Sequence, residues 1–503
     1  MKQRFAGTCD VLQVCIPTLA SSATGGLLNR VWYTLCHLAR QCFPFPITDE
    51  PKKHSITYLI LAVFLVGYLA IALEHKLHID KAATALLIGT ICWTLYLVDL
   101  PDLLPADSIP AWFSQVVEGE PTEALPLHYA IDVQHLHQTG EIASILFFLI
   151  GAMTIVELID AHEGFALVTD RIYTRSRRGL LWTIGLMTFF LSAALDNLTT
   201  TIVTVSVLKK IIDDREGRWK FIGIVIIAAN AGGAWTVIGD VTTTMLWIRH
   251  KLGATEVMGK LFLGSLVCLI VPLIGMSWRM PGQIQSPPIA PTSIDSHIRP
   301  WHKWLFLMLG IGGLLFVPAF KAPTHLPPYM GMMLSLAVLW VVSECVGRTF
   351  DETQRTSTGV HELLRRIDMS SILFFLGILL AVGALSATGL LHVAADAMDA
   401  WLPNRDAVAV TIGLVSAVID NVPLVAAGIE MYDLPTNDPF GMLLAYRAGT
   451  GGSCLIIGSA AGVAAMGLDQ IDFVWYIRKI AGWALLGYLA GAAVVIAMQA
   501  MAG

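Results

Sequence analysis

The sequence predicts an all-α polytopic membrane protein built from inverted-topology repeats, each with a re-entrant hairpin and a broken transmembrane helix. Three observations predict this fold class. The 503 residues are 55% hydrophobic and 14% charged, with a mean hydropathy of +0.67, a balance that soluble domains of this length do not show. Two distant segments carry the same short motifs in the same order, and basic residues flank these segments unequally.

Eight apolar stretches have the length of a membrane-crossing helix, which needs about 20 apolar residues. They are Tyr58 to Leu73, Ala82 to Val98, Ile142 to Ile159, Leu261 to Trp278, Trp304 to Phe320, Tyr329 to Val346, Ser371 to Leu390 and Ile480 to Met498. Three longer stretches, near 180–208, 221–248 and 441–466, do not read as simple spans.

The remaining composition limits the partners and cofactors. A net charge of −6 without a basic run argues against a nucleic-acid partner. The cysteines occur singly, without a CxxC pair or a metal-ligand cluster, so we expect no cofactor. The acidic segment Leu100 to Gly140 is expected to be an exterior loop, with cation attraction or pH sensing as the alternative. Residues 1–56 are an N-terminal extension of uncertain role, either a targeting segment, an interfacial helix or translation from an upstream start.

An internal duplication is visible in the motifs. The sequence SILFFL occurs at Ser144–Leu149 and again at Ser371–Leu376, and an Asp-Asn pair follows each copy, at Asp196-Asn197 and at Asp420-Asn421. The glycine-rich motif NAGGAWTVIGDVTTTM then follows the first pair, and GTGGSCLIIGSAAGVAAM follows the second. Three motifs in one order indicate a repeat.

The charges around the Asp-Asn pairs predict opposite orientations, because Lys and Arg mark the cytoplasmic side of a membrane protein. The first pair is flanked by nine basic residues, Arg171, Arg175, Arg177, Arg178, Lys209, Lys210, Arg215, Arg218 and Lys220. The flanks of the second pair, about 391–406 and 430–440, hold Arg405 among six acids, Asp396, Asp399, Asp406, Glu430, Asp433 and Asp438.

These features predict the domain organisation. The expected parts are the extension 1–56, a first transmembrane half 57–278 with repeat 1 at about 141–248, a cytoplasmic linker 279–303, and a second half 304–503 with repeat 2 at about 368–466.

The long stretches are expected to be interrupted. One helix over 180–208 would reach about 43 Å, against a hydrocarbon core of about 30 Å. Because both flanks are basic, we expect a re-entrant hairpin with Asp196-Asn197 at its tip and a mirrored hairpin with Asp420-Asn421 at its tip. The glycine-rich stretches 230–240 and 449–459 are expected to break two helices, so that tips and breaks meet near the membrane midplane.

The polar residues at these places predict a cation site. A carboxylate inside a bilayer costs several kcal/mol unless it is paired, hydrated, protonated or bound to a cation. Amide, hydroxyl and carbonyl oxygens are ligands for a hard ion, and the carbonyls of Gly232-Gly233 are expected to complete the oxygen shell. The candidate cation- and proton-binding residues are Ser192, Asp196, Asn197, Thr200, Asn230, Asp240, Thr242, Thr243, Ser416, Asp420 and Asn421.

We assign Na⁺ to Asp196, Asn197, Asp420 and Asn421. Na⁺ and H⁺ then compete for one group, which at an alternately accessible site is a mechanism of exchange. Asp240 corresponds to Ser459 in the second repeat, so the two half-sites are expected to be unequal.

Structural alternatives accompany these assignments. An intramembrane Asp can cap a broken helix, and Thr199 to Thr201 can bond to carbonyls of their own helix. Glu157, Asp160 and Glu163 are candidates for a cytoplasmic proton pathway, with a solvated helix end as the alternative.

The chain resembles the NhaD-type sodium/proton antiporters of the ion transporter superfamily from about Tyr58 to the C-terminus. The resemblance is carried by EHKLHIDKAATALL, TIVELIDAHEGF, ALDNLTTTIV, ANAGGAWTVIGDVTTTMLW and GTGGSCLIIGSAAGVAAMG. It implies extrusion of Na⁺ and Li⁺ in exchange for H⁺, a role in pH homeostasis, and movement of the hairpin-bearing region against a scaffold. It also implies that the polar residues within these motifs take part in cation binding or translocation.

Two other functions remain open. A sodium-coupled anion carrier of the same superfamily would share the architecture but should present neutral groups and helix N-termini to a carboxylate substrate. An intramembrane aspartyl protease would use Asp196 with Asp420 or Asp240 as an acid/base dyad. We expect a secondary transporter rather than an enzyme, in the lipid bilayer of a bacterial inner membrane, and a homodimer is compatible with the sequence.

Overall fold

The computed structural model describes residues 55–72, 74–98, 100–104, 109–110, 112–113, 124–169, 176–283, 298–348, 350, 358–402, 405–417 and 421–502. They belong to one compact unit, Lys53–Gly503. Except for residues 55 and 56, the predicted N-terminal extension lies outside the described residues. The regular structure of the described part is helical, and its one pairing of extended backbone is an isolated bridge between Ser176 and Gln283. The all-α prediction is confirmed.

Each of the eight predicted spans is a helix. These helices are α3 (Ser55–Ala72), α5 (Lys81–Val98), α9 (Leu136–Ala161), α15 (Ala254–Trp278), α16 (Pro300–Thr324), α17 (Pro328–Gly347), α20 (Met369–Ala387) and α27 (Gly482–Ala502). All except α3, whose apolar part is the shorter segment Ile56–Ile71, have the length and hydropathy of a membrane span. Large apolar side chains such as Leu87, Phe316 and Val341 are exposed on them, as expected for residues that contact lipid.

The predicted exterior loop is wrong in its second half. The helix α8 (Leu125–His128) continues through a π-helical segment (Tyr129–His135) into α9, and the continuous helix has 37 residues. At about 1.5 Å per residue it is roughly 55 Å long, longer than the hydrocarbon core. A helix satisfies its own backbone hydrogen bonds and can therefore continue into water, so hydropathy marked only its apolar part.

Short helices connect the long ones. They are α4 (Glu74–Leu77), α6 (Leu100–Leu103), α10 (Ala166–Thr169), α19 (Val360–Leu364), α21 (Leu390–Trp401) and α26 (Phe473–Tyr476), and a π-helical segment (Ile477–Ala481) joins α26 to α27.

The interrupted stretches are divided into pairs of helices, as predicted. The first hairpin consists of α11 (Arg177–Ala194) and α12 (Asn197–Ile211), and the second Asp-Asn pair lies between α22 (Arg405–Val415) and α23 (Asn421–Met431). The broken helices are α13 (Arg215–Ala234) with α14 (Val241–Ile248), and α24 (Pro439–Gly451) with α25 (Ala460–Asp469). Asp420 itself lies outside the described residues.

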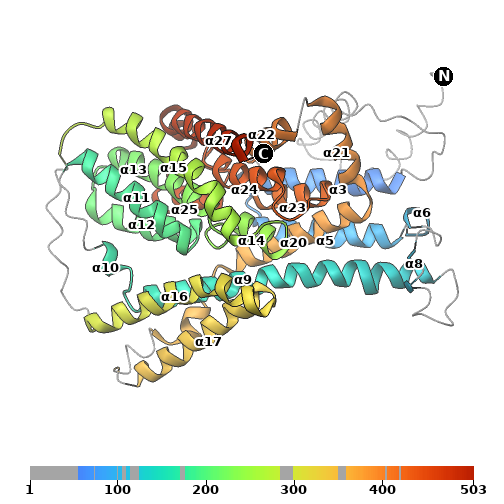
Figure 1. Cartoon of the computed structure of the whole chain (residues 1–503), viewed down its shortest axis with the longest axis horizontal. Helices are drawn as coiled ribbons and strands as arrows, with labels where there is room; N and C mark the ends of the chain where they lie inside the picture. The colour runs from blue at the N-terminus through green and yellow to red at the C-terminus, as the bar shows by residue number, and fades with distance from the viewer. Residues whose placement is uncertain are drawn as a thin grey trace, which may run out of the picture. The chain divides into compact units, whose positions relative to one another are not determined.

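The helices around the breaks pack in a crossed pattern. The first parts of the two broken helices, α13 and α24, pack on each other. In the hairpins, α12 packs on α25 and α23 packs on α14, so each hairpin contacts the second part of the other half's broken helix. Outside this core, α5 runs along α20, and α9 lies between these helices and the pair α16 and α17 (Figure 1).

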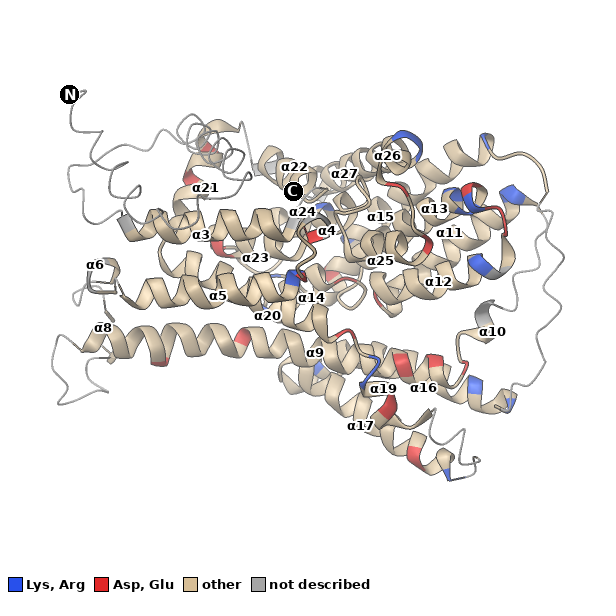
Figure 2. Ribbon diagram, turned by 180° about the vertical axis from the view of Figure 1, so that it is seen from behind, with Lys and Arg blue, Asp and Glu red and all other residues tan. Residues whose placement is uncertain are grey.

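The basic residues gather at one end of the helices. Figure 2 shows Lys and Arg at the free ends of α11, α12, α13 and α16, and none on the described residues at the other end, near α6 and α8. The ends of α11 and α13 carry Arg177, Arg178, Arg215, Arg218 and Lys220. The positive-inside rule predicts that this end is the cytoplasmic one.

Candidate functional site

The first hairpin turns at Asp196. This residue has extended backbone between α11 and α12 and is the N-cap of α12. Its Oδ1 accepts a hydrogen bond from the Thr199 backbone N–H at 2.7 Å, and its Oδ2 accepts one from Thr199 Oγ1 at 2.8 Å. Asp196 therefore does cap a broken helix, as the structural alternative described. Capping does not preclude cation binding, since a carboxylate has about four acceptor sites.

Asn197 connects the hairpin tip to both halves of the chain. Its Nδ2 donates to Asn230 Oδ1 on α13 at 3.1 Å. Asn230 Nδ2 in turn donates to Ser453 Oγ at 2.9 Å and to Ser459 Oγ at 2.8 Å, both in the break between α24 and α25. Asn197, Asn230 and both serines are buried. A single hydrogen-bond network thus joins the first hairpin to the second broken helix.

The break between α13 and α14 runs from Trp235 to Asp240. Asp240 is buried and caps α14, where its Oδ1 accepts from the Thr242 N–H at 3.3 Å. A Cβ at Gly449 of α24 would lie 2.8 Å from Asp240 Oδ2, so the carboxylate points at the second half of the chain. Gly232 and Gly233, whose carbonyls we expected in an unwound segment, lie in the last helical turn of α13.

The predicted hydroxyl ligands differ in availability. Thr200 Oγ1 and Thr242 Oγ1 are buried and have no hydrogen-bond partner among the described residues. By contrast, Thr201 Oγ1 donates to Asn197 O at 2.7 Å and Thr243 Oγ1 donates to Asp240 O at 2.9 Å. Threonines in helices often donate to a preceding backbone carbonyl in this way. A buried group without a partner suits a water or ion ligand.

Two further buried hydroxyls without a partner in the described residues, Thr188 and Thr204, lie on the hairpin helices α11 and α12. Thr204 follows Thr200 by four residues and therefore lies on the same face of α12, one turn nearer the cytoplasmic end. The sequence contained these residues, but their burial became apparent only from the structure.

Ser192 and Ser416 occupy equivalent positions in the two halves. Ser192 Oγ donates to Ala229 O on α13 at 2.6 Å, and Ser416 Oγ donates to Ala448 O on α24 at 3.0 Å. Each serine therefore ties a hairpin to the broken helix of its own half. Asn421, which follows the second tip, is buried at the start of α23.

Glycines allow the same close approach in both halves. A Cβ at Gly232 would lie 2.2 Å from Phe189 O, and a Cβ at Gly451 would lie 2.2 Å from Gly413 O. No side chain fits at that distance, so the backbones of hairpin and broken helix touch at both places.

The proposed proton-pathway residues end α9 beside α16. Glu157 is half-buried and Asp160 is exposed, whereas Glu163 forms an ion pair with Lys303 at 2.5 Å. The neighbouring His162 is buried and stacks on Phe306. An exposed acid and an ion-paired acid beside a buried imidazole fit a solvated helix end, and a proton pathway through these residues stays a prediction.

Ion pairs close the core at the end where the basic residues gather. Arg218 of α13 binds Asp469 at the end of α25, with 2.8 Å between Nη2 and Oδ1, and Lys209 Nζ donates to Leu468 O. Both members of the Arg218–Asp469 pair are largely buried. The pair joins two elements 251 residues apart in the chain.

A second ionic cluster lies at the opposite end of the core. Arg249, which ends α14, binds Glu430 of α23 and lies 3.0 Å from Glu141 of α9. Glu430 also accepts a hydrogen bond from Ser386 Oγ of α20 at 2.6 Å. This cluster therefore links the broken helix, the second hairpin and two of the long helices.

Comparison with known proteins agrees with this architecture. The family described as "Citrate transporter" matches residues 68–433. "Sodium/proton antiporter 1" of Arabidopsis thaliana is 47% identical over 87% of this chain and 72% of its own length, and "Sodium/proton antiporter 2" is 43% identical over 87% and 98%. The "Na(+)/H(+) antiporter NhaD" of Alkalimonas amylolytica is 28% identical over 97% of this chain and 98% of its own length.

The chain belongs to the NhaD-type sodium/proton antiporter family. NhaD-type proteins are secondary transporters, and this chain is a multi-pass membrane protein. The matches extend far beyond the hairpins and the breaks, so membership does not depend on the motifs around Asp196 alone.

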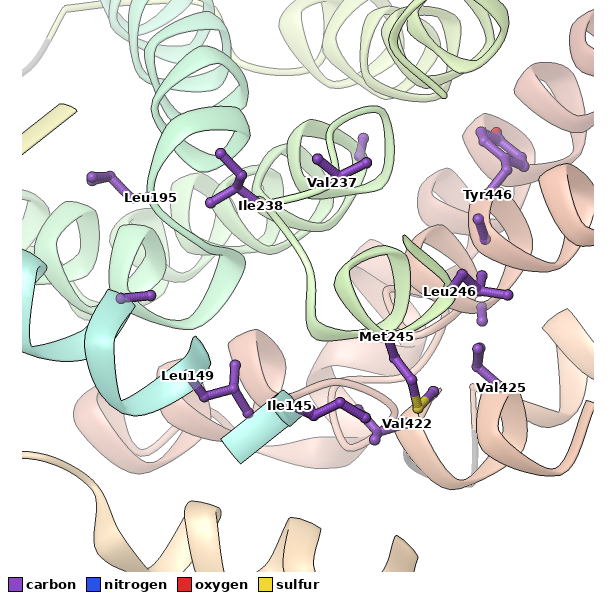
Figure 3. Close-up of a cluster of buried hydrophobic side chains, with 14 of the residues drawn as sticks. Ile145, Leu149, Leu195, Val237, Ile238, Met245, Leu246, Val422, Val425 and Tyr446 are labelled. Atoms are coloured by element: carbon purple, nitrogen blue, oxygen red, sulfur yellow. The ribbon is translucent and has the colours of Figure 1, made fainter. Parts of the chain in front are cut away.

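In this NhaD-type protein, apolar side chains hold the short helix α14 in place. Figure 3 shows Met245 and Leu246 of α14 beside Val422 and Val425 of α23, with Ile145 of α9 near them. All five side chains are buried. Asp240 thus caps a helix that packs against α9 of the first half and α23 of the second half.

Sequence reasoning missed one charged residue in this NhaD-type core. Arg447 of α24 is fully buried, with an exposed fraction of 0%. The sequence shows Arg447 as a lone arginine within the apolar stretch 441–466. It could have been singled out there, because ionisable residues inside a membrane segment are functional candidates by default.

Proposed function

We propose that the protein exchanges Na⁺, and also Li⁺, for H⁺ across a membrane, and so serves sodium extrusion and pH homeostasis. One observation carries the proposal. Asp196 and Asp240 each cap a helix that begins inside the apolar core. A few residues after each of them, at Thr200 and Thr242, lies a buried threonine hydroxyl that has no hydrogen-bond partner among the described residues. Carboxylate, amide and hydroxyl oxygens form the ligand set of a hard cation.

The mechanism follows from this donor set. A cation bound by Asp196 neutralises its carboxylate, and the same carboxylate takes a proton when the cation leaves toward the other side. Asn197 and Asn230 hold the tip against both halves of the core. The proposed cation ligands are those listed above from sequence, with Asp420 and Asn421 in the second half.

A second candidate function is sodium-coupled transport of a carboxylate. It is favoured by the matching family, which is described as "Citrate transporter". Against it stands the core chemistry, because the described core contains Asp196 and Asp240, and two carboxylates repel an anionic substrate. The relatives with full-length matches are named sodium/proton antiporters.

We also propose that the protein is a transporter and not a protease. In an aspartyl dyad two carboxyl groups share a proton at hydrogen-bond distance. The relatives with full-length matches are instead named sodium/proton antiporters.

The inverted repeat and the domain boundaries remain proposals. They are supported by the equivalent serine contacts and glycine approaches in the two halves, and by the opposite charge around the two Asp-Asn pairs. Labelling of single cysteines placed at residues 213 and 436 from each side of the membrane tests the orientation. We expect these sites to react from opposite sides, and reaction from the same side contradicts the inversion.

The membrane and the assembly are likewise proposals. A bacterial inner membrane is supported by the bacterial relatives at 28–29% identity, whereas the relatives at 47% and 43% are from Arabidopsis thaliana. Localisation of residues 1–56 fused to a fluorescent protein distinguishes an organellar address from a cell membrane. A homodimer predicts a doubled mass in native mass spectrometry.

The decisive test is proton release from acidified everted vesicles, read with a pH-gradient dye as NaCl, LiCl and KCl are added between pH 6.5 and 9.5. We expect Na⁺ and Li⁺ to collapse the gradient and Asp196→Asn to abolish this response with protein still in the membrane. Near-normal sodium-dependent proton release in that variant would contradict the assignment of Asp196 to the cation site. No response of the wild type, with sodium-dependent citrate uptake, would favour the second candidate.

A further inference from the structure

The inference concerns three buried threonine hydroxyls on the first hairpin. Thr188 lies on α11, and Thr200 and Thr204 lie on α12. Each residue has an exposed fraction of 0%, and none of the three hydroxyls has a hydrogen-bond partner among the described residues. A threonine in a helix can satisfy its hydroxyl on a preceding backbone carbonyl, as Thr201 does. Three hydroxyls that do not do so suit a water or an ion as their partner.

Thr188 and Thr204 lie at the same depth in the hairpin. Thr188 precedes Asp196 by eight residues, and Thr204 follows it by eight. The helices α11 and α12 pack on each other on either side of the turn at Asp196 (Figure 1). At about 1.5 Å per residue, both threonines therefore lie about 12 Å from the tip. Halfway between them and the tip, four residues on either side of Asp196, lie Ser192 and Thr200.

Both threonines face the broken helix α13. Thr188 lies one turn before Ser192, whose Oγ donates to a backbone carbonyl of α13. Thr204 lies two turns after Asn197, whose Nδ2 donates to a side chain of α13. Residues four or seven apart share one face of a helix. Since α11, α12 and α13 pack on one another in every pair, the two hydroxyls lie where these three helices meet.

Apolar side chains follow the threonines toward the base of the hairpin. One turn beyond them lie Ile184 on α11 and Leu208 on α12, both with an exposed fraction of 0%. Near the base, the ion pair between Arg218 and Asp469 joins α13 to α25. The hydroxyls are thus separated from the predicted cytoplasmic side by apolar side chains.

The second hairpin has no such row of hydroxyls. Counted in the same way from the second Asp-Asn pair, the equivalents of the three threonines are Ile412, Leu424 and Gly428. A Cβ at Gly428 would lie 2.9 Å from Leu444 Cδ2 of α24, so apolar groups fill this depth of the second hairpin. The hydroxyls therefore belong to the first hairpin alone and are not a general requirement for packing a hairpin against a broken helix.

We propose that Thr188 and Thr204 form a second cation subsite, where a partly hydrated Na⁺ or Li⁺ binds on its way between Asp196 and the predicted cytoplasmic side. The inference rests on the proposed Na⁺/H⁺ exchange and deepens it. Hydroxyl oxygens are ligands for a hard cation. Two neutral hydroxyls replace part of its hydration shell without holding it tightly, and a passing ion must both enter and leave.

Loss of these hydroxyls should slow the passage of sodium and leave its equilibrium binding at Asp196 unchanged. In everted vesicles, Thr188→Val and Thr204→Val should each lower kcat/KM for Na⁺ about fivefold, the effect expected of one hydrogen-bonding ligand. Equilibrium binding of ²²Na⁺ to the purified full-length protein should be that of the wild type. Thr204→Ser keeps the hydroxyl and should restore most of the rate. Ser206→Ala, on the exposed side of α12, is the control and should behave as the wild type.

Three results would contradict the subsite. Wild-type kcat/KM in both valine variants would overturn it. A parallel fall in equilibrium binding would also overturn it, because the threonines would then be ligands of the site at Asp196. A merely structural role predicts less folded protein in the valine variants with wild-type kinetics per folded molecule, and this result overturns the proposal as well.

A thiol probe tests the position of the subsite without the valine variants. Ag⁺ is a monovalent cation that binds soft thiolate ligands. Added to everted vesicles, it should inhibit Thr188→Cys faster than Ile412→Cys, the equivalent variant of the second hairpin, and Na⁺ should slow the reaction at Thr188→Cys. The wild type measures the background from the native cysteines. Equal rates for the two variants would overturn this inference alone, whereas absence of sodium-dependent proton release in the wild type would overturn the proposed function.

Discussion

The carboxylates of the core cap helices, and we propose that they also bind the cation. Asp196 and Asp240 each cap a helix and face its N-terminus, where unpaired N–H groups and the helix dipole stabilise negative charge. This stabilisation lowers the cost of an ionised carboxylate inside the membrane. Capping is therefore compatible with the proposed binding of a cation by both groups.

Replacement of Asp240 by Asn separates the two tasks, because Asn caps a helix about as well as Asp but carries no charge. We expect Asp240→Asn to fold and to raise the KM for Na⁺ about tenfold or to change the preference between Na⁺ and Li⁺. Titration of vesicles with both salts measures this. Asp472→Asn, at the exposed cap of α26, is the control and should behave as the wild type. Wild-type kinetics of Asp240→Asn for both ions would contradict the prediction.

Adjacent threonines provide a second test at this scale. Thr200 has a buried hydroxyl without a described partner, whereas the hydroxyl of Thr201 is bonded within its own helix. Thr200→Val should raise the KM for Na⁺ roughly fivefold to tenfold, since a lost hydrogen-bonding ligand is worth about 1 kcal/mol. Thr201→Val should change it less than twofold. Equal effects of the two changes would show that Thr200 is no ligand.

At the scale of elements, the core is held together by crossing contacts. Each hairpin packs on the second part of the other half's broken helix. At one end of the core Arg218 binds Asp469, and at the other Arg249 binds Glu430. The first hairpin is therefore fixed at its tip through Asn197 and at its base through Lys209, and α23 of the second hairpin is fixed through Glu430.

The cytoplasmic pair can be tested by a double-mutant cycle. Removal of one member of a buried pair leaves an uncompensated charge and typically costs about 3 kcal/mol or more. Arg218→Met and Asp469→Leu should each lower the melting temperature of the purified protein, and the double variant should recover part of the loss. Lys260→Met, from an exposed pair with Glu256, should have little effect. Additive losses in the double variant would show that the pair is not coupled.

The sequence indicated the interruptions better than the contacts between them. Asp196 and Asp240 lie within long apolar stretches, so the positions of the helix breaks could be predicted from polarity and length. The break after α13 nevertheless starts after the glycines, because Gly232 serves close packing against Phe189 rather than unwinding. Pairs such as Arg218 and Asp469, which join distant segments, have no local signature and required the structure.

At the scale of the whole molecule, the charge distribution sets the orientation in the membrane. The basic ends of α11, α13 and α16 predict the cytoplasmic side (Figure 2), and ion pairs close the described core at both ends. Exchange requires that the core open to one side at a time. The buried charge of the core must also stay compatible with a stable protein over the pH range in which it works.

His162, beside the cytoplasmic end of α9, gives the stability of the molecule a defined pH dependence. The pKa of His162 is lowered to about 4, mainly by burial and to a smaller extent by the neighbouring His302. The Nδ1–H of its neutral ring donates to Leu158 O at 2.8 Å. Nε2 has no hydrogen-bond partner among the described residues, so protonation would place an unpaired N–H against apolar neighbours.

Acid lowers the free energy of unfolding, because the unfolded chain binds the proton more tightly than the folded protein does. The unfolded chain, with an ordinary histidine pKa of 6.5, binds more protons than the folded protein between about pH 6.5 and pH 4. The stabilising contribution of neutral His162 is therefore complete above pH 6.5 and is lost as the pH falls toward 4. At pH 5 the loss is about 2 kcal/mol.

We expect His162→Gln to reduce this acid sensitivity. Between pH 7.5 and pH 5 the melting temperature of the purified protein should fall by a few degrees less in His162→Gln than in the wild type, because glutamine does not titrate. The exposed His361→Gln is the control and should follow the wild-type curve. Parallel curves for His162→Gln and the wild type would contradict the prediction, because they would mean that acid destabilises the protein through other groups.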